Sequence, residues 1–212
     1  RTKELVEEAS LIKNEIKELE NKIEVYQKKI DEILPFIPNI PLDIVPIGND
    51  EKDNKEILVR QDLGRGLVKN VKPHYEIAVE KSIIDFERAV KMSGTRFALF
   101  KNNGAKLVRA LENFMLDFHY KNGYEEILPP VIVSSNTLFG TGQLPKFKDD
   151  LFKIENEDLW LIPTAEVPVT NYYNNEIIDL SKPKKMTSYT LCFRSEAGSS
   201  GKDTKGLIRS RQ

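Results

Sequence analysis

Cysteine and histidine are scarce in this sequence. There is one cysteine, Cys192, and there are two histidines, His74 and His119. A single cysteine cannot build a disulfide framework, and an ordinary structural zinc site of Cys and His ligands needs about four of them. We therefore exclude a disulfide-stapled scaffold and a zinc-finger fold.

Long apolar runs and a strong net charge are also missing. No apolar stretch approaches the roughly 18 residues of a membrane-spanning helix, and the N-terminus mixes Glu with Lys, unlike a signal or transit peptide. The 32 Lys and Arg against 33 Asp and Glu give a formal net charge of −1, so no global positive field predicts a nucleic-acid binder. We expect a cytoplasmic protein with no membrane partner, in which any nucleic acid would contact a local surface.

The motifs of several large enzyme classes are absent as well. There is no G-x-S-x-G, H-E-x-x-H or C-x-x-C. The segment Gly198-Ser-Ser-Gly201-Lys202 fails as a phosphate-binding P-loop, because its glycines are separated by two residues rather than four. Asp203 also stands where that motif needs Ser or Thr, and no helix is expected to follow.

The strongest pattern that is present is a helical periodicity at the N-terminus. Apolar residues recur there at alternating steps of four and three, at Leu5, Ala9, Ile12, Ile16, Leu19, Ile23, Tyr26, Ile30 and Ile33. This is a heptad register, and it predicts one long helix over residues 1–34 within an arm segment, 1–37. One such stripe cannot bury itself, so a dimerising coiled coil and one limb of a helical hairpin both remain open.

A connector and a globular part follow the helix. Prolines at 35, 38, 41 and 46 forbid helix continuation, which predicts an extended connector over 38–72. From Pro73 the composition becomes globular, and 40% apolar residues are enough for a core over 73–212. The apolar spacing predicts a helix through 83–90 that ends at Gly94, a strand at 96–100, and a helix from Gly104 to Gly123 with a one-sided apolar stripe.

The second half of the globular part predicts short strands around one helix. Strands are expected at 125–129, 131–133, 151–154 and 159–162, and a helix at 165–175. Thr164 is then placed as an N-cap for that helix, and Glu166 falls in its first turn.

The last segment, 188–212, carries a constellation of charges. We predict an antiparallel strand pair joined by the loop 197–206, with Arg194, Glu196, Arg209 and Arg211 displayed on it. Guanidinium groups suit phosphate oxygens and a carboxylate suits an amino group, so this pair predicts a nucleotide site, with a solvated hairpin as the alternative.

Five segments together carry a resemblance to a known family. FRSEAGSSGKDTKGLIR (193–209) resembles motif 2 of the class II aminoacyl-tRNA synthetases, and GYEEILPPVIV (123–133) resembles their motif 1. GTGQLPKF (140–147), LIPTAEVPVTN (161–171) and DFERAVKMSGTRF (85–97) look like segments of the seryl-tRNA synthetase family in particular. The resemblance spans all 212 residues, with the motifs in the expected order.

This resemblance implies a fold and an activity. The fold would be α+β, with a class II antiparallel sheet flanked by helices and preceded by a long coiled-coil arm helix. The activity would be that of a serine–tRNA ligase, which uses ATP and Mg²⁺ to form seryl-adenylate from L-serine and then charges tRNA(Ser) and tRNA(Sec). The enzyme would be a homodimer through residues 105–133.

The resemblance also implies roles for single residues. Thr164, Ala165 and Glu166 would hold L-serine, with the Glu166 carboxylate on the substrate ammonium. Arg194 would be the catalytic arginine that bridges the ATP α-phosphate and the serine carboxylate. Further ATP contacts would come from Ser195, Glu196, Arg209 and Ser210, and contacts of the loop with ATP and the tRNA acceptor end from Ser199, Ser200, Lys202 and Lys205. No residue of this segment would bind a metal.

Two expectations concern completeness and the alternatives. The family's first arm helix is expected before Arg1 and its motif 3 after Gln212, so we expect this segment alone to be inactive. One alternative is a class II paralogue that charges a non-tRNA acceptor, and the heptads argue against it because such paralogues typically lack the arm. The other is a non-enzymatic coiled-coil interaction protein, against which the combination of Thr164, Glu166, Arg194 and Glu196 argues.

Overall fold

The computed structural model describes residues 2–60, 69–196, 205–208 and 210–211. They fall into two compact units, residues 1–60 and 61–212. The division into arm, connector and catalytic domain expected from the sequence stays a prediction.

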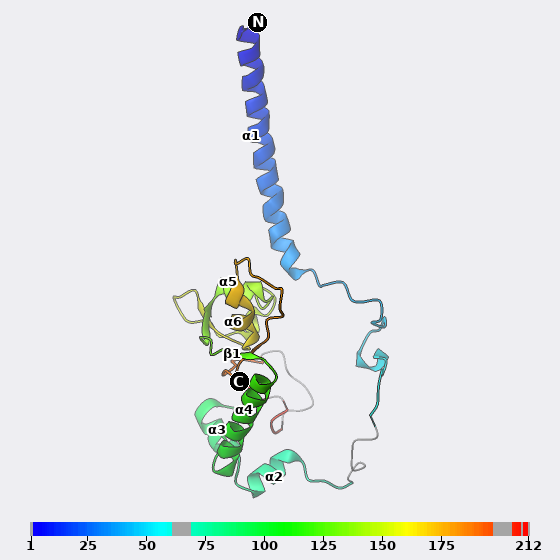
Figure 1. The fold of residues 1–212 in the computed structure, drawn as a ribbon, viewed down its shortest axis with the longest axis vertical. Coiled ribbons are helices and arrows are strands. Elements are labelled where there is room, and N and C mark those ends of the chain that lie inside the picture. Colours follow the sequence, from blue (N-terminus) through cyan, green and yellow to red (C-terminus); the bar gives the residue numbers. More distant parts are fainter. Residues whose placement is uncertain (1, 61–68, 197–204, 209, 212) are drawn as a thin grey trace. The chain divides into compact units, whose positions relative to one another are not determined.

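The first unit consists of a long helix and an irregular segment. Helix α1, Thr2–Ile33, is the N-terminal helix of Figure 1, and no residue of it is buried. The helix expected over 1–34 is therefore confirmed, and its heptad side chains are at least 49% exposed wherever they are large. Two single turns, η1 (Leu34–Phe36) and η2 (Glu51–Asp53), are the only other regular elements among the described residues up to Arg60.

Three helices open the second unit. They are α2 (His74–Glu80), α3 (Phe86–Ser93) and α4 (Asn103–Lys121). Helix α3 begins after Asp85, whose side chain accepts a hydrogen bond from the Arg88 N–H at 3.1 Å. It ends at Gly94, where a φ of 90° favours glycine, so the end of this helix is confirmed while its start lies later than expected.

The strand expected at 96–100 is wrong. Only Phe100 pairs, in an isolated antiparallel bridge with Ile84. Arg96 has a φ of 75°, outside the extended region, so the chain turns where a strand would have to begin. Helix α2 was not expected either.

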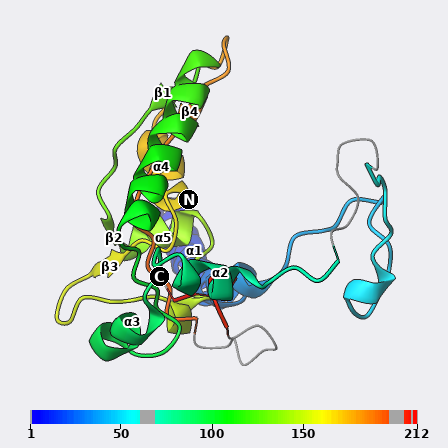
Figure 2. The same cartoon turned by 90° about the horizontal axis from the view of Figure 1, so that it is seen from below.

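The described residues form two small sheets of two strands each, one parallel and one antiparallel. Strand β1 (Glu125–Glu126) pairs in parallel with β4 (Met186–Thr187), and both lie beside α4 in Figure 2. Strand β2 (Ile132–Ser134) pairs antiparallel with β3 (Leu159–Leu161). The α+β class is confirmed, although the β1–β4 pair is parallel, and the strand expected at 151–154 is reduced to a bridge between Lys153 and Trp160.

The core of the second unit lies under the β2–β3 pair. Its buried side chains are Val133, Leu138, Leu151, Trp160, Ile162 and Val167. They come from both strands, from α5 (Ser135–Gly140), from α6 (Glu166–Thr170) and from the residues directly after β3 and η3 (Lys148–Asp150). Ser134 caps α5 by accepting a hydrogen bond from the Thr137 N–H. Because Leu151 and Ile162 belong to this core, the chain around both residues is held in place.

Two expectations near the C-terminal end need correction. The helix expected at 165–175 is only α6, followed by the turn η4 (Asn171–Tyr173), and its N-cap residue is Ala165 rather than Thr164. The antiparallel pair expected over 188–212 is absent from the described residues there. The Phe193 N–H bonds to Ile162 and the Leu207 N–H to His74, so these main-chain groups are taken by other partners and cannot form a ladder.

Candidate functional site

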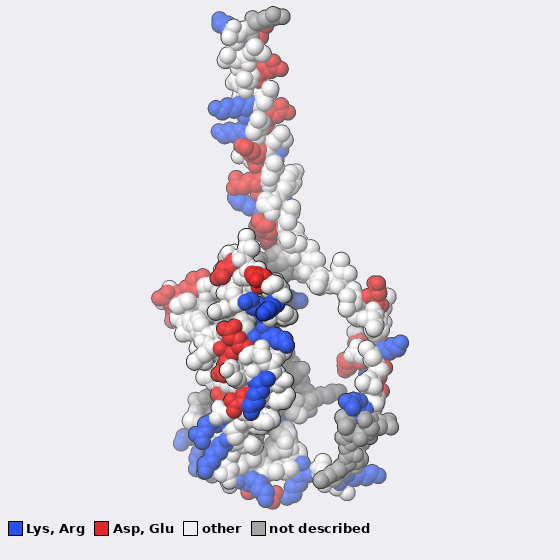
Figure 3. All heavy atoms as spheres, in the orientation of Figure 1, with Lys and Arg blue, Asp and Glu red and all other residues white. Residues whose placement is uncertain are grey.

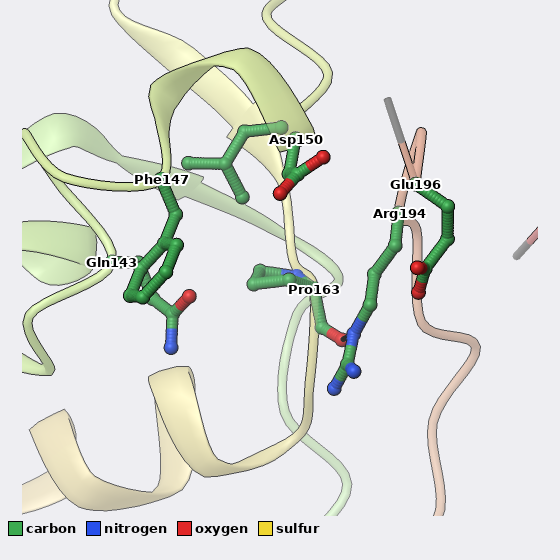
Figure 4. A pocket seen from close by; sticks show the side chains of 7 residues that line it. Gln143, Phe147, Asp150, Pro163, Arg194 and Glu196 are labelled. Carbon is green, nitrogen blue, oxygen red and sulfur yellow. Dashed lines mark hydrogen bonds between the residues drawn. The ribbon is translucent and has the colours of Figure 1, made fainter. Parts of the chain in front are cut away.

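A cavity of about 370 Å³ lies where the 193–196 segment meets the core. It is lined by Gln143, Phe147, Asp150, Leu151, Pro163, Arg194 and Glu196. Figure 4 shows the Arg194 and Glu196 side chains on one side of it, with Phe147 and Gln143 across from them. The cavity thus combines a guanidinium, two carboxyl groups, an amide and an aromatic ring.

Main-chain hydrogen bonds on both sides of Arg194 place it at this cavity. The Phe193 N–H donates to the Ile162 carbonyl at 2.8 Å, and the Ser195 N–H donates to the Asp150 carbonyl at 3.1 Å. The Ser195 hydroxyl also donates to the Asp149 carbonyl at 3.0 Å. The chain at 193–195 is therefore held between the end of β3 and η3.

The Arg194 side chain is fixed at its base. Its Nε–H donates to the Pro163 carbonyl at 2.9 Å. This bond uses one edge of the guanidinium and orients the Nη groups, whose paired donors fit a phosphate or carboxylate. Pro163 is buried and follows the core residue Ile162 directly, so the contact rests on a rigid part of the chain.

Glu196 completes the cavity in an unusual backbone conformation. Its φ is 51°, in the left-handed region that costs a non-glycine residue about 1 kcal/mol or more. The Arg96 Nη1 group donates to its carbonyl oxygen at 3.4 Å. The carboxylate of Glu196 can accept from an amino group, so Arg194 and Glu196 together offer contacts for an anion and for an N–H donor.

Comparison with known proteins relates the chain to tRNA synthetases. Residues 147–212 match the family described as the tRNA synthetase class II core domain (G, H, P, S and T). The chain is 62% identical over 207 residues to the serine–tRNA ligase of Mycoplasma mobile, covering 98% of this chain and 49% of that protein. It is 60% identical over 209 residues to the serine–tRNA ligase of Mycoplasmopsis agalactiae, covering 99% and 50%.

Solved structures agree with these relatives. A crystal structure of seryl-tRNA synthetase from Pyrococcus horikoshii complexed with ATP matches with a TM-score of 0.76 and 35% identity, over 92% of this chain and 48% of that one. The cytoplasmic serine–tRNA ligase of Naegleria fowleri in complex with AMP matches with a TM-score of 0.80 and 26% identity, over 92% and 47%. Over nearly its whole length, the chain is similar to serine–tRNA ligases and seryl-tRNA synthetases. It spans about half the length of the curated relatives it matches.

The structure brings together only part of the residue set expected for this family. Arg194 and Glu196 line the cavity, whereas Thr164, Ala165 and Glu166 follow its wall residue Pro163 but do not line it themselves. Glu166 is exposed at the start of α6. The serine-binding and nucleotide-binding roles of these residues stay predictions.

The other expected residues lie elsewhere or outside the described residues. Ser195 hydrogen bonds to Asp149 rather than lining the cavity. Lys205 lines a second cavity of about 500 Å³. The Ser210 hydroxyl is buried with no hydrogen-bond partner among the described residues. Outside the described residues lie Ser199, Ser200, Lys202 and Arg209.

Three lining residues were not singled out from the sequence. Gln143 and Phe147 belong to the GTGQLPKF segment, whose glycines predicted a loop but no side-chain role. Asp150 gave no signal, because one carboxylate in a Lys–Asp-rich turn looks like an ordinary solvated residue. Only the fold shows that these three face Arg194.

Proposed function

We propose that the full-length protein carrying this chain is an ATP-dependent serine–tRNA ligase. It activates L-serine to seryl-adenylate and transfers the seryl group to the 3′ end of tRNA(Ser), and of tRNA(Sec). The observation that carries the proposal is the Arg194–Glu196 cavity beside Pro163, in a chain 62% identical to a protein named serine–tRNA ligase.

The proposed first step needs positioning more than covalent help from the protein. The serine carboxylate attacks the α-phosphorus of ATP, the new C–O–P bond forms, and pyrophosphate leaves with the electrons of the broken P–O bond. Negative charge grows on the α-phosphate oxygens in the transition state. The Nη groups of Arg194, already oriented by Pro163, would stabilise that charge and hold the attacking carboxylate.

Separate groups would select the two substrates. Thr164, Ala165 and Glu166 begin directly after Pro163, so a serine held by them would lie next to the Arg194 guanidinium, with its ammonium on Glu166. Glu196 would accept from the adenine amino group, and the Ser210 main chain would contact the base. In the second step the terminal ribose hydroxyl of tRNA attacks the seryl carbonyl and displaces AMP.

Mg²⁺ would enter this reaction with the phosphates of ATP. Among the residues that the structure describes, no three His, Cys, Asp or Glu side chains gather as a metal site. Mg²⁺ that arrives on the ATP phosphates needs only one or two protein carboxylates, and it would supply charge neutralisation at those phosphates.

The tRNA body would be bound by the helical arm. On the face of α1 that Figure 3 shows, Lys side chains are interspersed with Asp and Glu. Such a surface suits recognition of RNA shape and backbone rather than of bases. No helix among the described residues is long and apolar enough to cross a membrane, and we place the proposed reaction in the cytoplasm.

A second copy of the chain is the proposed partner for α4. Its apolar stripe is exposed: Leu107 55%, Leu111 48%, Phe114 65%, Met115 52% and Phe118 54%. A contiguous apolar face of this kind marks an interface, and we propose that the 105–133 segments of two subunits cover each other.

The deciding experiment is serine-dependent ATP–pyrophosphate exchange by the full-length protein, with each proteinogenic amino acid in turn. We expect exchange above background with serine, and its absence would overturn the assignment. Arg194→Ala should abolish this exchange while the free energy of unfolding changes by less than about 1 kcal/mol. Lys182→Ala, which removes an exposed cation that neither lines the cavity nor lies in the 105–133 segment, is the control and should keep exchange.

A further inference from the structure

Two residues that do not line the Arg194 cavity hold the described segments on either side of residues 197–204. On one side, Arg96 Nη1 donates to the Glu196 carbonyl at 3.4 Å. On the other, the Leu207 N–H donates to Nε2 of His74 at 2.9 Å, and the Arg211 N–H donates to the Arg96 carbonyl at 2.9 Å. Arg96 thus contacts both segments, and His74 contacts the one that contains Leu207.

We propose that His74 and Arg96 are positioning residues for the nucleotide site, an inference that rests on the proposed function. Arg96 fixes the backbone of Glu196, and His74 fixes that of Leu207. Neither residue needs to touch the substrate.

Arg96 acts on a backbone that does not hold its conformation by itself. Glu196 is at a φ of 51°, which a non-glycine residue keeps only when its surroundings impose it. The Arg96 guanidinium supplies such a constraint at the Glu196 carbonyl, one bond away from the Cα that carries the nucleotide-contacting side chain. Arg96 therefore sets the direction in which the Glu196 carboxylate enters the cavity.

His74 acts on the returning segment, by which we mean the described residues 205–208 and 210–211. It is the first residue of α2, directly after Pro73, and its ring meets Tyr75 edge-on at 5.5 Å between centroids. Its Nε2 atom accepts the Leu207 N–H at 2.9 Å. Gly206 has a φ of 80°, and a Cβ on it would overlap the imidazole, so only glycine lets the chain approach this closely.

Packing alone does not fix the returning segment. A cavity of about 500 Å³ lies at this junction, lined in part by Tyr75, Phe86, Arg96, Lys205 and Gly206. Leu207 and Ile208 are both exposed, at 36% and 68%. With little apolar burial to hold it, the segment depends on the His74 and Arg96 hydrogen bonds, which bracket the proposed adenine contact at Ser210.

The test measures steady-state ATP–pyrophosphate exchange of the full-length protein with His74→Ala and Arg96→Ala. Loss of one hydrogen bond to the main chain should raise KM for ATP by about three- to tenfold. KM for serine should change by less than about twofold, because no contact near Thr164–Glu166 is altered. His74→Gln offers an oxygen to the Leu207 N–H and should restore KM for ATP. Lys72→Ala, which breaks only the exposed Lys72–Glu80 ion pair beside α2, is the control and should match wild type.

The outcomes separate the two proposals. Wild-type protein without serine-dependent exchange would overturn the proposed function itself. Normal exchange in wild type together with an unchanged KM for ATP in both alanine variants would overturn only the positioning role. Equal rises in KM for ATP and serine, not corrected by His74→Gln, would also overturn it, because they indicate a general structural defect.

Discussion

Arg194 is oriented by bonds that the protein makes without substrate. The two main-chain hydrogen bonds of Phe193 and Ser195 hold its backbone, and the Pro163 carbonyl holds its Nε. A donor fixed in this way needs no reorganisation when charge develops on a bound phosphate, which is the main advantage of a preorganised site. The sequence predicted Arg194 and Glu196 from their charge, but not Gln143 or Asp150, since those enter the cavity only through the fold.

Asp85 carries a second set of charged contacts, which act on stability rather than on the site. Its carboxylate is 8% exposed and accepts from Lys101 Nζ at 2.9 Å and from the Arg88 guanidinium at 2.6 Å. The Lys101 hydrogen bond first, and those of Arg88 next, hold the pKa of the Asp85 carboxyl well below its usual range. These bonds join the start of α3 to the segment before α4.

The sign of the pH effect follows from that lowered pKa. A carboxyl whose pKa is lower in the folded state stabilises the fold above its unfolded pKa, about 3.9, and loses this contribution as pH falls through the folded value. We expect Asp85→Asn to lower Tm at pH 7, and the difference from wild type to shrink below about pH 4. Thermal melts across pH measure it. Glu80→Gln, which removes an exposed ion pair, should leave Tm nearly unchanged, and an Asp85→Asn difference that does not depend on pH would contradict this account.

Helices were predicted from the sequence better than strands, for a physical reason. The periodicity of α1 and α4 and the glycine that ends α3 are local signals, and the structure confirms them. A strand needs a partner that the local sequence does not reveal. The expected strand at 96–100 therefore fails at the positive φ of Arg96, and the parallel pairing of β1 with β4, about sixty residues apart, could not be predicted.

The exposed apolar face of helix α4 leads to a prediction about dimerisation. Its exposed apolar face includes Phe114, which is 65% exposed, and the proposed dimer would bury this ring. Phe114→Glu should convert the full-length dimer to a monomer in light scattering, because a charge would have to be buried unpaired. By the 3.6-residue period Asn113 lies on the side of the helix opposite the centre of the apolar stripe, so Asn113→Glu should remain dimeric. Equal masses for Phe114→Glu and wild type would contradict this interface.

At the scale of the whole molecule, the two units differ in whether their described elements bury side chains. Helix α1, η1 and η2 contain no buried residue, whereas the buried core cluster consists of residues between 133 and 167. A change in α1 should therefore leave the core and the Arg194 cavity intact, since neither includes a side chain from residues 2–33.

This division predicts that amino-acid activation and tRNA charging can be separated. In the full-length protein, deleting residues 2–33 should leave serine-dependent exchange within about twofold of wild type, because the groups proposed to bind serine and ATP all lie beyond residue 73. Aminoacylation of tRNA(Ser) should fall by about tenfold or more through a higher KM for tRNA, which corresponds to about 1.4 kcal/mol of lost binding. Unchanged charging would exclude α1 from tRNA recognition. Exchange lost in parallel with charging would show instead that activation depends on the arm.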